Sequence, residues 1–552
     1  MENPITIAGA QPAEPKRTMP FLPGSSLGIA EYTGAWDTPQ VVHLLKRTLF
    51  GATVQDINYF KTKTMSQAVD ELLIPTAVPS TAPLNDYGAD PTGVSPWQTW
   101  INTGLLYSDP DLNENRLHSL QAWWIGQLLN PGRSIHEKIT LFWHNHFAMD
   151  ATVHYDDIPA RLWYDQYMTL RQNALGDFRQ LVRSIVLNPA MLIYLNGSTN
   201  TKKAPNENFA RELQELYTIG KGPGSQYTEN DVHAAARALT GHTLDNNYSY
   251  VFQSGDHDDT NKSFSNFYSS HIITGYSGPA GANELDDLLG MIFSTDESAK
   301  FICRKLYGFF VYYKIDAATE TNVITPLANI LRTSNYNITP VLSALLKSQH
   351  FHDLVYSGAC IIKSPLDLLI GLVREFNVPI TNADPAKQYA AWKMLNDRAT
   401  ILQQEIMGVP LVAGWDAYRQ APQYQELWIN SVTYSGRNFY TDLLIGPGDM
   451  MMGASLQINA IAFASQLSAP DNADQLISDS LAVLLRPPLS DNSRDLLKRS
   501  ILLTGQADDK YWTKAWQAYT VNPADMNAFT AVDTRLRALY KYIMDLPEYQ
   551  LS

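Results

Sequence analysis

The feature that most constrains the fold of this chain is a succession of amphipathic helices, each ended by Pro, Gly or Asn. Residues 116–129 show the pattern, because their apolar side chains recur at helical spacing and the run stops at Asn130-Pro131-Gly132. Thr228 and Asp231 are spaced as a capping box at the start of another run, which Gly241 ends. The chain is therefore expected to fold mainly as helices.

The same pattern predicts helices along most of the chain. They are expected from about 133 to 147, from Asp157 to Gly176, from Asp177 to Asn188, and over 229–240, 295–313, 323–332, 340–349, 365–376, 386–406, 452–467, 490–503 and 523–545. Strand signals are few. The expected fold class is all-α, a large multi-helix body with long irregular loops and few or no strands.

Four stretches interrupt the helical pattern: 1–35, 75–96, 241–282 and 408–438. Loops of this length in a compact protein are usually functional or disordered. The last two contain His257, Trp415 and Arg437, which favours an ordered surface. We expect an N-terminal arm over 1–35 and one unit over 36–552. A subdivision near 314–325, into an N-terminal half that carries the motifs and a C-terminal helical half, is the alternative.

The charge of the chain limits its partners. It has 41 Lys and Arg against 55 Asp and Glu, a formal charge of −14, and 17% of its 552 residues are charged. Because an acidic chain has no basic field for phosphodiesters, no nucleic acid is expected as a partner. Apolar residues make up 45% of the chain, which is enough for a large core and excludes global disorder.

Cysteines and targeting signals are sparse. Cys303 and Cys360 are too few for a disulfide scaffold or a Cys-rich zinc site, so both are expected to pack in the core. No run approaches about 18 apolar residues, so no transmembrane segment is expected. Residues 1–23 hold five prolines and no apolar leader core, which predicts a cytoplasmic location. A periplasmic or secreted location is the alternative if a leader was removed or another export route is used.

Several common catalytic motifs are absent. There is no G-x-S-x-G elbow, and Gly220-Lys221-Gly222-Pro223-Gly224 has neither the spacing nor the preceding strand of a P-loop or dinucleotide fingerprint. His136-Glu137 begins like a zincin helix, but Thr140 stands where the second histidine must be. Segments 109–113 and 256–259 lack the Gly and Glu of a calcium loop.

The first polar cluster that remains is Trp143-His144-Asn145-His146, in a run that begins at Glu137. At about 100° per residue the two histidines lie about 200° apart on a helix. They reach one ligand only if the helix ends near Asn145; otherwise one is catalytic and the other structural, or both are core histidines bonded to carbonyls. Flanking aromatic residues predict burial, which lowers a histidine pKa.

The second cluster lies in Asn206–Tyr217. An apolar stripe through Phe209, Leu213 and Leu216 would leave Arg211, Glu212 and Glu215 on the opposite face of the helix. Glu207, Arg211 and Glu215 are then successive i,i+4 pairs. They form either a solvated ladder of ion pairs or a site in which the carboxylates bind a metal or act as acid and base.

The third cluster follows Gly241 and contains His242, His257, Asp258 and Lys262. A histidine beside a carboxylate can be oriented as a base or metal ligand. Loops also collect such residues simply because they are exposed to water.

Taken in order, these clusters resemble the large bacterial family catalogued as domain of unknown function 1800. The residues that carry the resemblance are His43-Leu-Leu-Lys-Arg47-Thr-Leu-Phe50-Gly51, Phe142–Phe147, Asn188–Leu192, Asn206–Leu213, Tyr227–Val232, Ala236–Gly241, His257-Asp258, Gly414-Trp415 and Arg437–Phe439. They span roughly residues 36 to 552.

The resemblance implies little about activity, because the family has no established reaction. Its members look mainly helical, many carry export signals, and many are encoded beside a protein similar to sulfatases and alkaline phosphatases, which implies such a partner. This chain is expected to depart from the pattern in two ways, because no leader is predicted from its first residues and because Tyr217 stands where His or Phe is expected. The positions that the resemblance marks are His144, His146, Asn206, Glu207, Asn208, Arg211, Glu212, His257 and Asp258.

The leading hypothesis is an enzyme with a His/carboxylate site between helices, acting on a polymer, a glycan or an anionic ester. Its catalytic residues would come from His144, His146, Glu207, Arg211, Glu212, His257 and Asp258. A divalent or transition metal is the expected cofactor, with His144, His146, Glu212 and Glu215 as ligands. The alternative is a non-catalytic assembly or partner-binding protein, in which Tyr- and Trp-rich loops build an oligomer or complex. A glycan-binding module is the third hypothesis.

Overall fold

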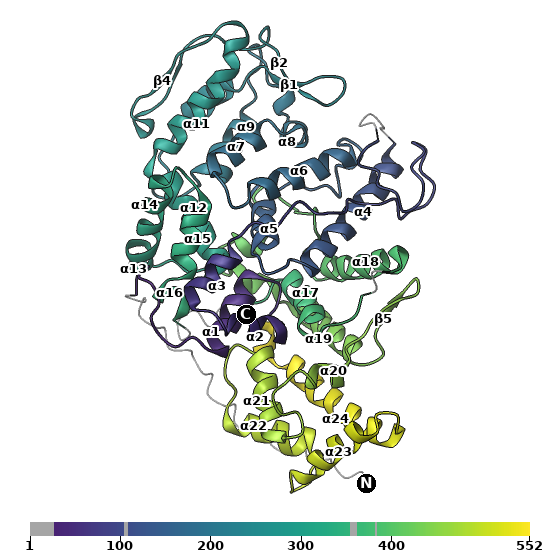
Figure 1. Cartoon of the computed structure of the whole chain (residues 1–552). Helices are drawn as coiled ribbons and strands as arrows, with labels where there is room; N and C mark the ends of the chain where they lie inside the picture. The colour runs from purple at the N-terminus through teal and green to yellow at the C-terminus, as the bar shows by residue number, and fades with distance from the viewer. Residues whose placement is uncertain (1–26, 104–108, 354–360, 381–382) are drawn as a thin grey trace, which may run out of the picture.

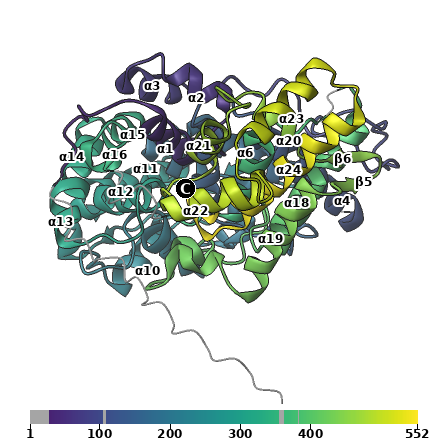
Figure 2. The same cartoon turned by 90° about the horizontal axis from the view of Figure 1, so that it is seen from below.

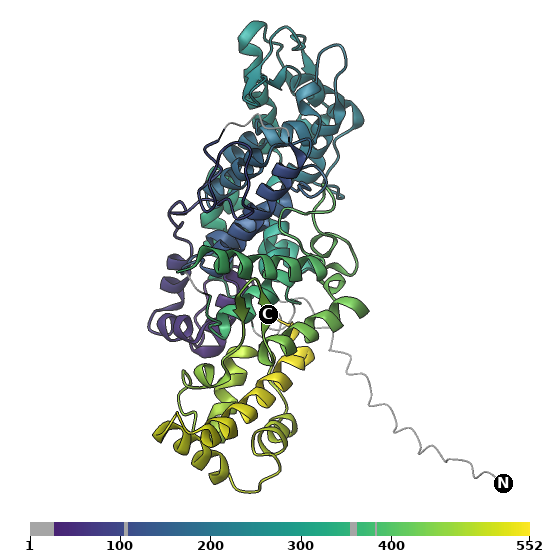
Figure 3. The same cartoon turned by 90° about the vertical axis from the view of Figure 1, so that its right-hand side faces the viewer.

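The computed structural model describes residues 27–103, 109–353, 361–380 and 383–552. Helices dominate it, and the three sheets in these ranges are two-stranded hairpins. The expected all-α fold is confirmed. The molecule is longer than it is wide, with the hairpins β1–β4 at one end and α20–α24 at the other (Figures 1 and 3).

The first half of the chain forms the centre and one end of the molecule. Its elements are α1 (Thr38–Thr48), α2 (Val54–Phe60), α3 (Met65–Leu72), α4 (Pro110–Leu129), α5 (His136–His146), α6 (Ala160–Asn173), α7 (Phe178–Val186), α8 (Pro189–Tyr194), α9 (Glu207–Glu212), the π-helical turn η2 (Leu213–Thr218), α10 (Glu229–Ala238), β1 (His242–Leu244), β2 (Tyr250–Phe252), β3 (Lys262–Ser263), β4 (Ile272–Ile273) and α11 (Glu284–Ser294).

The remaining elements extend the body to its other end. They are α12 (Asp296–Phe310), α13 (Ala317–Thr319), the π-turn η5 (Glu320–Ile324), α14 (Thr325–Thr333), α15 (Ile338–Leu346), α16 (Gln349–His352), α17 (Pro365–Glu375), α18 (Pro385–Ile401), α19 (Ser431–Ile445), β5 (Asp449–Met451), β6 (Ala454–Leu456), α20 (Ala460–Ala464), α21 (Ala473–Leu484), α22 (Asp491–Leu496), the π-turn η8 (Leu497–Leu502), α23 (Lys510–Val521) and α24 (Met526–Asp545).

Local sequence explains where many of these helices begin. Asp177 caps α7, and Thr228 and Asp231 make the predicted capping box of α10. Ser364 caps α17 with Pro365 at its first position, where a missing N–H costs nothing. The predicted helices at these places are confirmed.

One predicted helix is wrong. The apolar spacing predicts a helix over 452–467, but β5 and β6 form a hairpin that reaches into this segment, and only α20 is helical in its second part. Gly453 lies in the turn of the hairpin with φ of 80°. Glycine adopts this left-handed conformation without strain, so the chain turns where the helix pattern would have continued.

A single core runs through the described chain. Its buried apolar residues extend from Val41 to Tyr549 and include side chains on both sides of 314–325. Seen from below, α21, α22 and the end of the chain lie over the middle of the body (Figure 2). Lys363 N donates to Gln550 O at 2.8 Å, which ties the end of the chain to the start of α17.

Two of the sequence predictions fall partly outside the described residues. Cys303 lies in the core as expected, while Cys360 is outside the described ranges. Of the expected N-terminal arm over 1–35, residues 1–26 are likewise outside them.

No helix among the described residues combines the length and the apolar character needed to cross a membrane.

Candidate functional site: a basic cleft beside a buried histidine motif

Helix α5 carries the first predicted cluster through the centre of the molecule (Figure 1). Every residue from His136 to His146 is buried, so the helix has no solvated face. Each of its polar side chains therefore needs a partner inside the protein. Glu137 receives a hydrogen bond from Arg171 Nε at 2.7 Å, and Lys138 pairs with Asp367 at the start of α17.

His144 is a hydrogen-bond acceptor for the main chain. Its Nε2 accepts from the backbone N–H of Met407 at 3.2 Å, and its ring lies between Trp124 and Trp415 with centroids 5.0 and 5.7 Å away. Burial lowers the pKa of His144 to about 3, so the ring is neutral at physiological pH. In this role His144 fixes the segment that leads into the 408–428 loop.

Asn145 and His146 hold two further segments. Asn145 Oδ1 accepts from Trp415 N at 2.9 Å, and His146 Nε2 donates to Tyr217 O at 3.0 Å. Burial, together with the charge of Lys305, keeps the pKa of His146 well below its ordinary value. With the proton on Nε2, the buried Nδ1 is left as an acceptor with no partner among the described residues.

The two histidines therefore leave α5 in different directions. The helix continues to His146 rather than ending near Asn145, and the rings bond Met407 and Tyr217 respectively. Both histidines are therefore buried and bonded to the backbone, as in the alternative that treats them as core residues.

The second cluster lies partly at the protein surface, at Glu207 and Arg211, and partly inside the protein, at Glu215. Arg211 binds Glu207 at 3.2 Å, Glu229 at 2.6 Å and Glu215 at 3.6 Å, and Glu207 also contacts His233. This ladder is partly exposed. Burial and the nearby Glu215 raise the pKa of Glu212.

Glu215 lies inside the protein because of the π-turn η2. The i→i+5 bonds of this turn insert one residue and rotate the later side chains, so Glu215 is 8% exposed while Leu216 is only half-buried. Leu216 still packs against the core, as expected of the stripe, but Glu215, which was expected on the opposite face, is buried as well. Glu215 pairs with Lys221 as well as Arg211.

The third cluster forms a closed network. His257 contacts Thr240 O at 2.8 Å and Glu284 Oε1 at 3.0 Å, and Lys262 binds the other oxygen of Glu284 at 2.5 Å. Burial raises the pKa of Glu284, but the hydrogen bonds from His257 and Lys262 outweigh burial and lower it overall.

Asp258, next in sequence to His257, points to a different partner. Its carboxylate accepts from Arg237 Nε at 2.7 Å and from Thr260 N at 2.9 Å. Burial raises the pKa of Asp258, but these hydrogen bonds outweigh burial and lower it overall.

The four predicted metal ligands are thus not brought together: Glu212 lies near Glu215, whereas His144 and His146 bond to separate backbone groups. In the part of the chain that the structure describes, no group of three or more His, Cys, Asp or Glu side chains is arranged to hold a metal ion. Of the predicted catalytic and metal-binding residues, all of which are described, only Glu215 lines the large cleft.

This cleft, which we call the basic cleft, has a volume of about 840 Å³ and lies where α1, α5, α12 and α17 meet. Eight basic side chains line it against four acidic ones, Glu215, Glu297, Glu320 and Asp367. The basic ones are Lys46, Arg47, Lys138, Lys221, Lys300, Arg304, Lys305 and Arg419. The excess of positive charge is opposite to the formal charge of −14 of the whole chain.

Two glycine-dependent segments form part of the wall. Gly220 has φ of 88°, and a Cβ there would lie 2.5 Å from the Phe301 ring; it begins the glycine-rich segment up to Gly224. Gly414 has φ of 94°, and a Cβ there would lie 2.6 Å from Asn145 Oδ1. Only glycine allows this approach to the buried motif.

Aromatic side chains supply the uncharged part of the cleft. Phe142, Phe301, Phe309, Tyr418 and Trp428 all line it. Such a mixture of apolar wall and a few charged groups is typical of small-molecule sites.

The sequence patterns did not identify Lys305 as a functional residue. Phe301, Lys305 and Phe309 recur every four residues and so share one face of α12. A lysine between two phenylalanines on one stripe was the signal that could have identified it. Arg419 had no comparable signal, since its position depends on the fold of the 408–428 loop.

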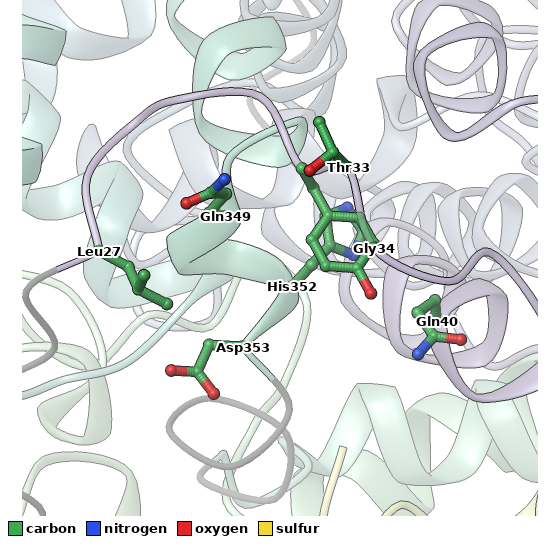
Figure 4. Close-up of a pocket in the computed structure, with 8 residues that line it drawn as sticks. Leu27, Thr33, Gly34, Gln40, Gln349, His352 and Asp353 are labelled. Atoms are coloured by element: carbon green, nitrogen blue, oxygen red, sulfur yellow. The ribbon is translucent and has the colours of Figure 1, made fainter.

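A second pocket of about 470 Å³ lies between residues 27–40 and α16 (Figure 4). His352 and Asp353 are the titratable groups at its wall besides Tyr32, and His352 Nε2 is bound to Leu346 O at 3.0 Å. It offers no lysine or arginine among its lining residues, so the basic cleft is the better candidate.

Comparison with known proteins identifies one family. The family model described as protein of unknown function (DUF1800) matches residues 43–551. No curated protein and no solved structure gives a match.

Proposed function

The chain belongs to the DUF1800 family, and from that premise we propose that it is an enzyme that binds an anionic substrate in the basic cleft. The observation that carries the proposal is the excess of basic side chains in the cleft of an acidic protein. Carboxylate, phosphate and sulfate groups are the ligands that lysine and arginine bind best.

The pairing of the lysines supports the assignment. Lys46 binds Glu375 at 2.6 Å, Lys138 binds Asp367 and Lys221 binds Glu215. Lys300 and Lys305 have no ion pair or hydrogen bond with the described residues. A cation in a cavity without a carboxylate partner is costly unless a ligand supplies the counter-charge.

In this proposal the motif His144-Asn145-His146 holds the walls of the cleft in place and does not itself bind the substrate or a metal. By fixing Met407, Trp415 and Tyr217, it positions the 408–428 loop and the end of η2, which bring Arg419 and Glu215 to the cleft. This role gives a reason for buried polar residues that packing alone does not require.

Calorimetric titration with inorganic phosphate tests the proposal. Wild type should bind phosphate, and Lys305→Gln should weaken binding about tenfold or more because a charged partner is lost. Lys203→Gln, an exposed lysine outside the cleft, is the matched control and should bind like wild type. Equal affinities of wild type and Lys305→Gln would overturn the proposal. Wild type and Lys305→Gln are then assayed with a panel of anionic esters and anionic carbonyl compounds, and the substrate is the compound that only wild type converts.

One observation favours the partner-binding alternative. Met450 and Met452, at the β5–β6 hairpin, are 70% and 83% exposed. Exposed methionines are common at protein contact surfaces. If Met450→Ser/Met452→Ser dissociates a complex on size-exclusion chromatography while phosphate binding is unchanged, the hairpin is a separate interaction surface.

A further inference from the structure

Lys305 differs from the other lysines of the basic cleft in its surroundings. It lies on α12, with its Nζ 5.3 Å from the centroid of the Phe301 ring one turn earlier. No carboxylate among the described residues contacts it, whereas Lys46, Lys138 and Lys221 each bind one. Its amine therefore faces the cavity without a partner.

Arg419 is the charged group that acts on Lys305 from across the cleft. Its side chain is held by Asp416 and by the carbonyl of Gly414 at 3.3 Å, and it lines the same cavity. Burial, and then the charge of Arg419, lower the pKa of Lys305 to about 8. Asp416, the carboxylate partner of Arg419, is not among the residues that line the cleft, so Lys305 and Arg419 face the cavity as two cations and offer a place for an anion.

At about pH 7.4 an amine with this pKa is about one-fifth neutral, against less than about a thousandth for an ordinary lysine. The neutral form is the one that attacks a carbonyl carbon. Desolvation in an apolar pocket and a neighbouring cation are the two means by which proteins activate a lysine as a nucleophile.

We propose that Lys305 forms a Schiff base with an aldehyde or ketone that carries an anionic group, the anion being held by Arg419. The proposal rests on the proposed function and names its substrate class. Phe301 and Phe309 would pack against the carbon skeleton between the two ends of the substrate.

The step balances without an oxidant or reductant. The Nζ lone pair forms a bond to the carbonyl carbon while the C=O π electrons move to oxygen. A proton moves from nitrogen to that oxygen to give the carbinolamine. A proton from solvent then binds the hydroxyl, the C–O bond breaks, and water leaves as the nitrogen lone pair forms the C=N bond of the protonated Schiff base.

Reductive trapping tests the proposal with pyridoxal 5′-phosphate, an aldehyde that carries a phosphate. Full-length protein is incubated with the probe, reduced with borohydride and mapped by peptide mass spectrometry. Lys305 should be labelled about tenfold more than Lys300, which lines the same cleft on the same helix, because the lowered pKa of Lys305 leaves part of its amine neutral. Inorganic phosphate should compete, and Arg419→Gln should reduce labelling of Lys305.

The pH dependence adds a second readout. Labelling of Lys305 should rise with a midpoint near pH 8 rather than above 10. The other charged side chains that line the cleft are Lys46, Arg47, Lys138, Glu215, Lys221, Glu297, Lys300, Arg304, Glu320, Asp367 and Arg419, its titratable phenols are Tyr313, Tyr418 and Tyr424, and His146 lies within reach of the Lys305 charge. Of these, Arg419 is the one whose charge shifts the pKa of Lys305. Lys305→Arg should lose the label while circular dichroism shows its helicity unchanged, and Lys203→Arg, at an exposed lysine outside the cleft, is the control that should leave labelling of Lys305 as in wild type.

The failures of the two proposals are distinguishable. If phosphate binds wild type but Lys305 is not labelled, or exposed lysines are labelled equally, the Schiff-base proposal is overturned and the anionic cleft stands. If phosphate neither binds nor competes, and Lys305 is unlabelled, both proposals fail.

Discussion

At the scale of single residues, burial decides the chemistry of this protein more than residue type does. His144 and Lys305 are both basic side chains whose pKa burial lowers, to about 3 and about 8. His144 is enclosed and bonded to the main chain, so it positions a loop. Lys305 reaches a cavity and has no partner among the described residues, so it is available to a ligand.

The acceptor role of His144 leads to the first prediction. His144→Phe keeps the ring packing against Trp124 and Trp415 but leaves the Met407 N–H unpaired, which should cost about 1–3 kcal/mol in the free energy of unfolding. The measurement is urea unfolding at pH 7 and pH 5. Because the folded pKa lies below the unfolded value of 6.5, the stability that neutral His144 provides is complete above pH 6.5 and declines below it.

The difference between wild type and His144→Phe should therefore shrink as the pH falls from 7 to 5. A difference that stays constant with pH would show that His144 has no titration linked to folding.

Removal of the Lys305 charge gives the second prediction. Lys305→Met should increase the free energy of unfolding by about 1–2 kcal/mol at pH 7, because it removes a desolvated, unpaired ammonium. The folded pKa of about 8 is below the unfolded value of 10.5, so the penalty is complete below pH 8 and disappears as the pH rises through 10.5. Urea unfolding at pH 7 and pH 10 measures both the gain and its decline.

Lys203→Met is the control for the loss of an exposed charge and should leave stability within about 0.5 kcal/mol of wild type. A Lys305→Met protein that is less stable than wild type at pH 7 would contradict the assignment of an unpaired cation.

At the scale of elements, turns with special backbone geometry place the walls of the cleft. The π-turn η2 moves Glu215 inward, and Gly414 brings the 408–428 loop against Asn145. Both depend on backbone geometry that amphipathic patterns do not encode.

The close packing of Gly414 on Asn145 can be tested by comparison with a second glycine that has a similar φ but no close neighbour. Gly414→Ala should lower the free energy of unfolding by about 2–4 kcal/mol, because a Cβ adds a clash with Asn145 to the strain of a positive φ. Gly505→Ala has a similar φ of 83° and no atom within 4 Å of the new Cβ, so it measures the backbone strain alone. Chemical unfolding and limited proteolysis of the 408–428 loop are the measurements.

If Gly414→Ala and Gly505→Ala lower the free energy of unfolding by the same amount, the clash with Asn145 does not contribute to the destabilisation. Faster cleavage in the loop of Gly414→Ala is expected, because the loop is held at this point.

At the scale of the whole molecule, several buried neutral histidines link stability to pH. Burial lowers the pKa of His242 and His352 to about 4 and of His144 to about 3, and holds those of His43 and His146 well below the ordinary value. All five bind protons on unfolding between about pH 4 and 6.5. The free energy of unfolding should therefore fall as the pH falls through this window.

Calorimetry in buffers of different ionisation enthalpy measures the proton uptake. At pH 5 unfolding should take up about three or more protons. Uptake of one proton or none would contradict the neutral, buried state of these rings.

Much of the architecture follows from local sequence. The caps at Asp177, Thr228 and Ser364 and the apolar spacing behind them place α7, α10 and α17, because these signals act within one or two turns. The prediction for 452–467 was wrong because its apolar residues fit a hairpin and a short helix as well as one long helix. The predicted set did not include helices α1, α2, α3, α11, α19, α21 and α23.

By itself, then, the sequence determined the fold class, the family and the burial of the His144–His146 motif, since spacing and composition carry this information. The groups that this motif binds, and the place where a ligand fits, depend on how segments far apart in the chain pack together. Lys305 and Arg419 are 114 positions apart and meet in one cleft only after α12 and the 408–428 loop have packed around α5. A site built from distant segments is a property of packing, and the local pattern of either segment does not contain it.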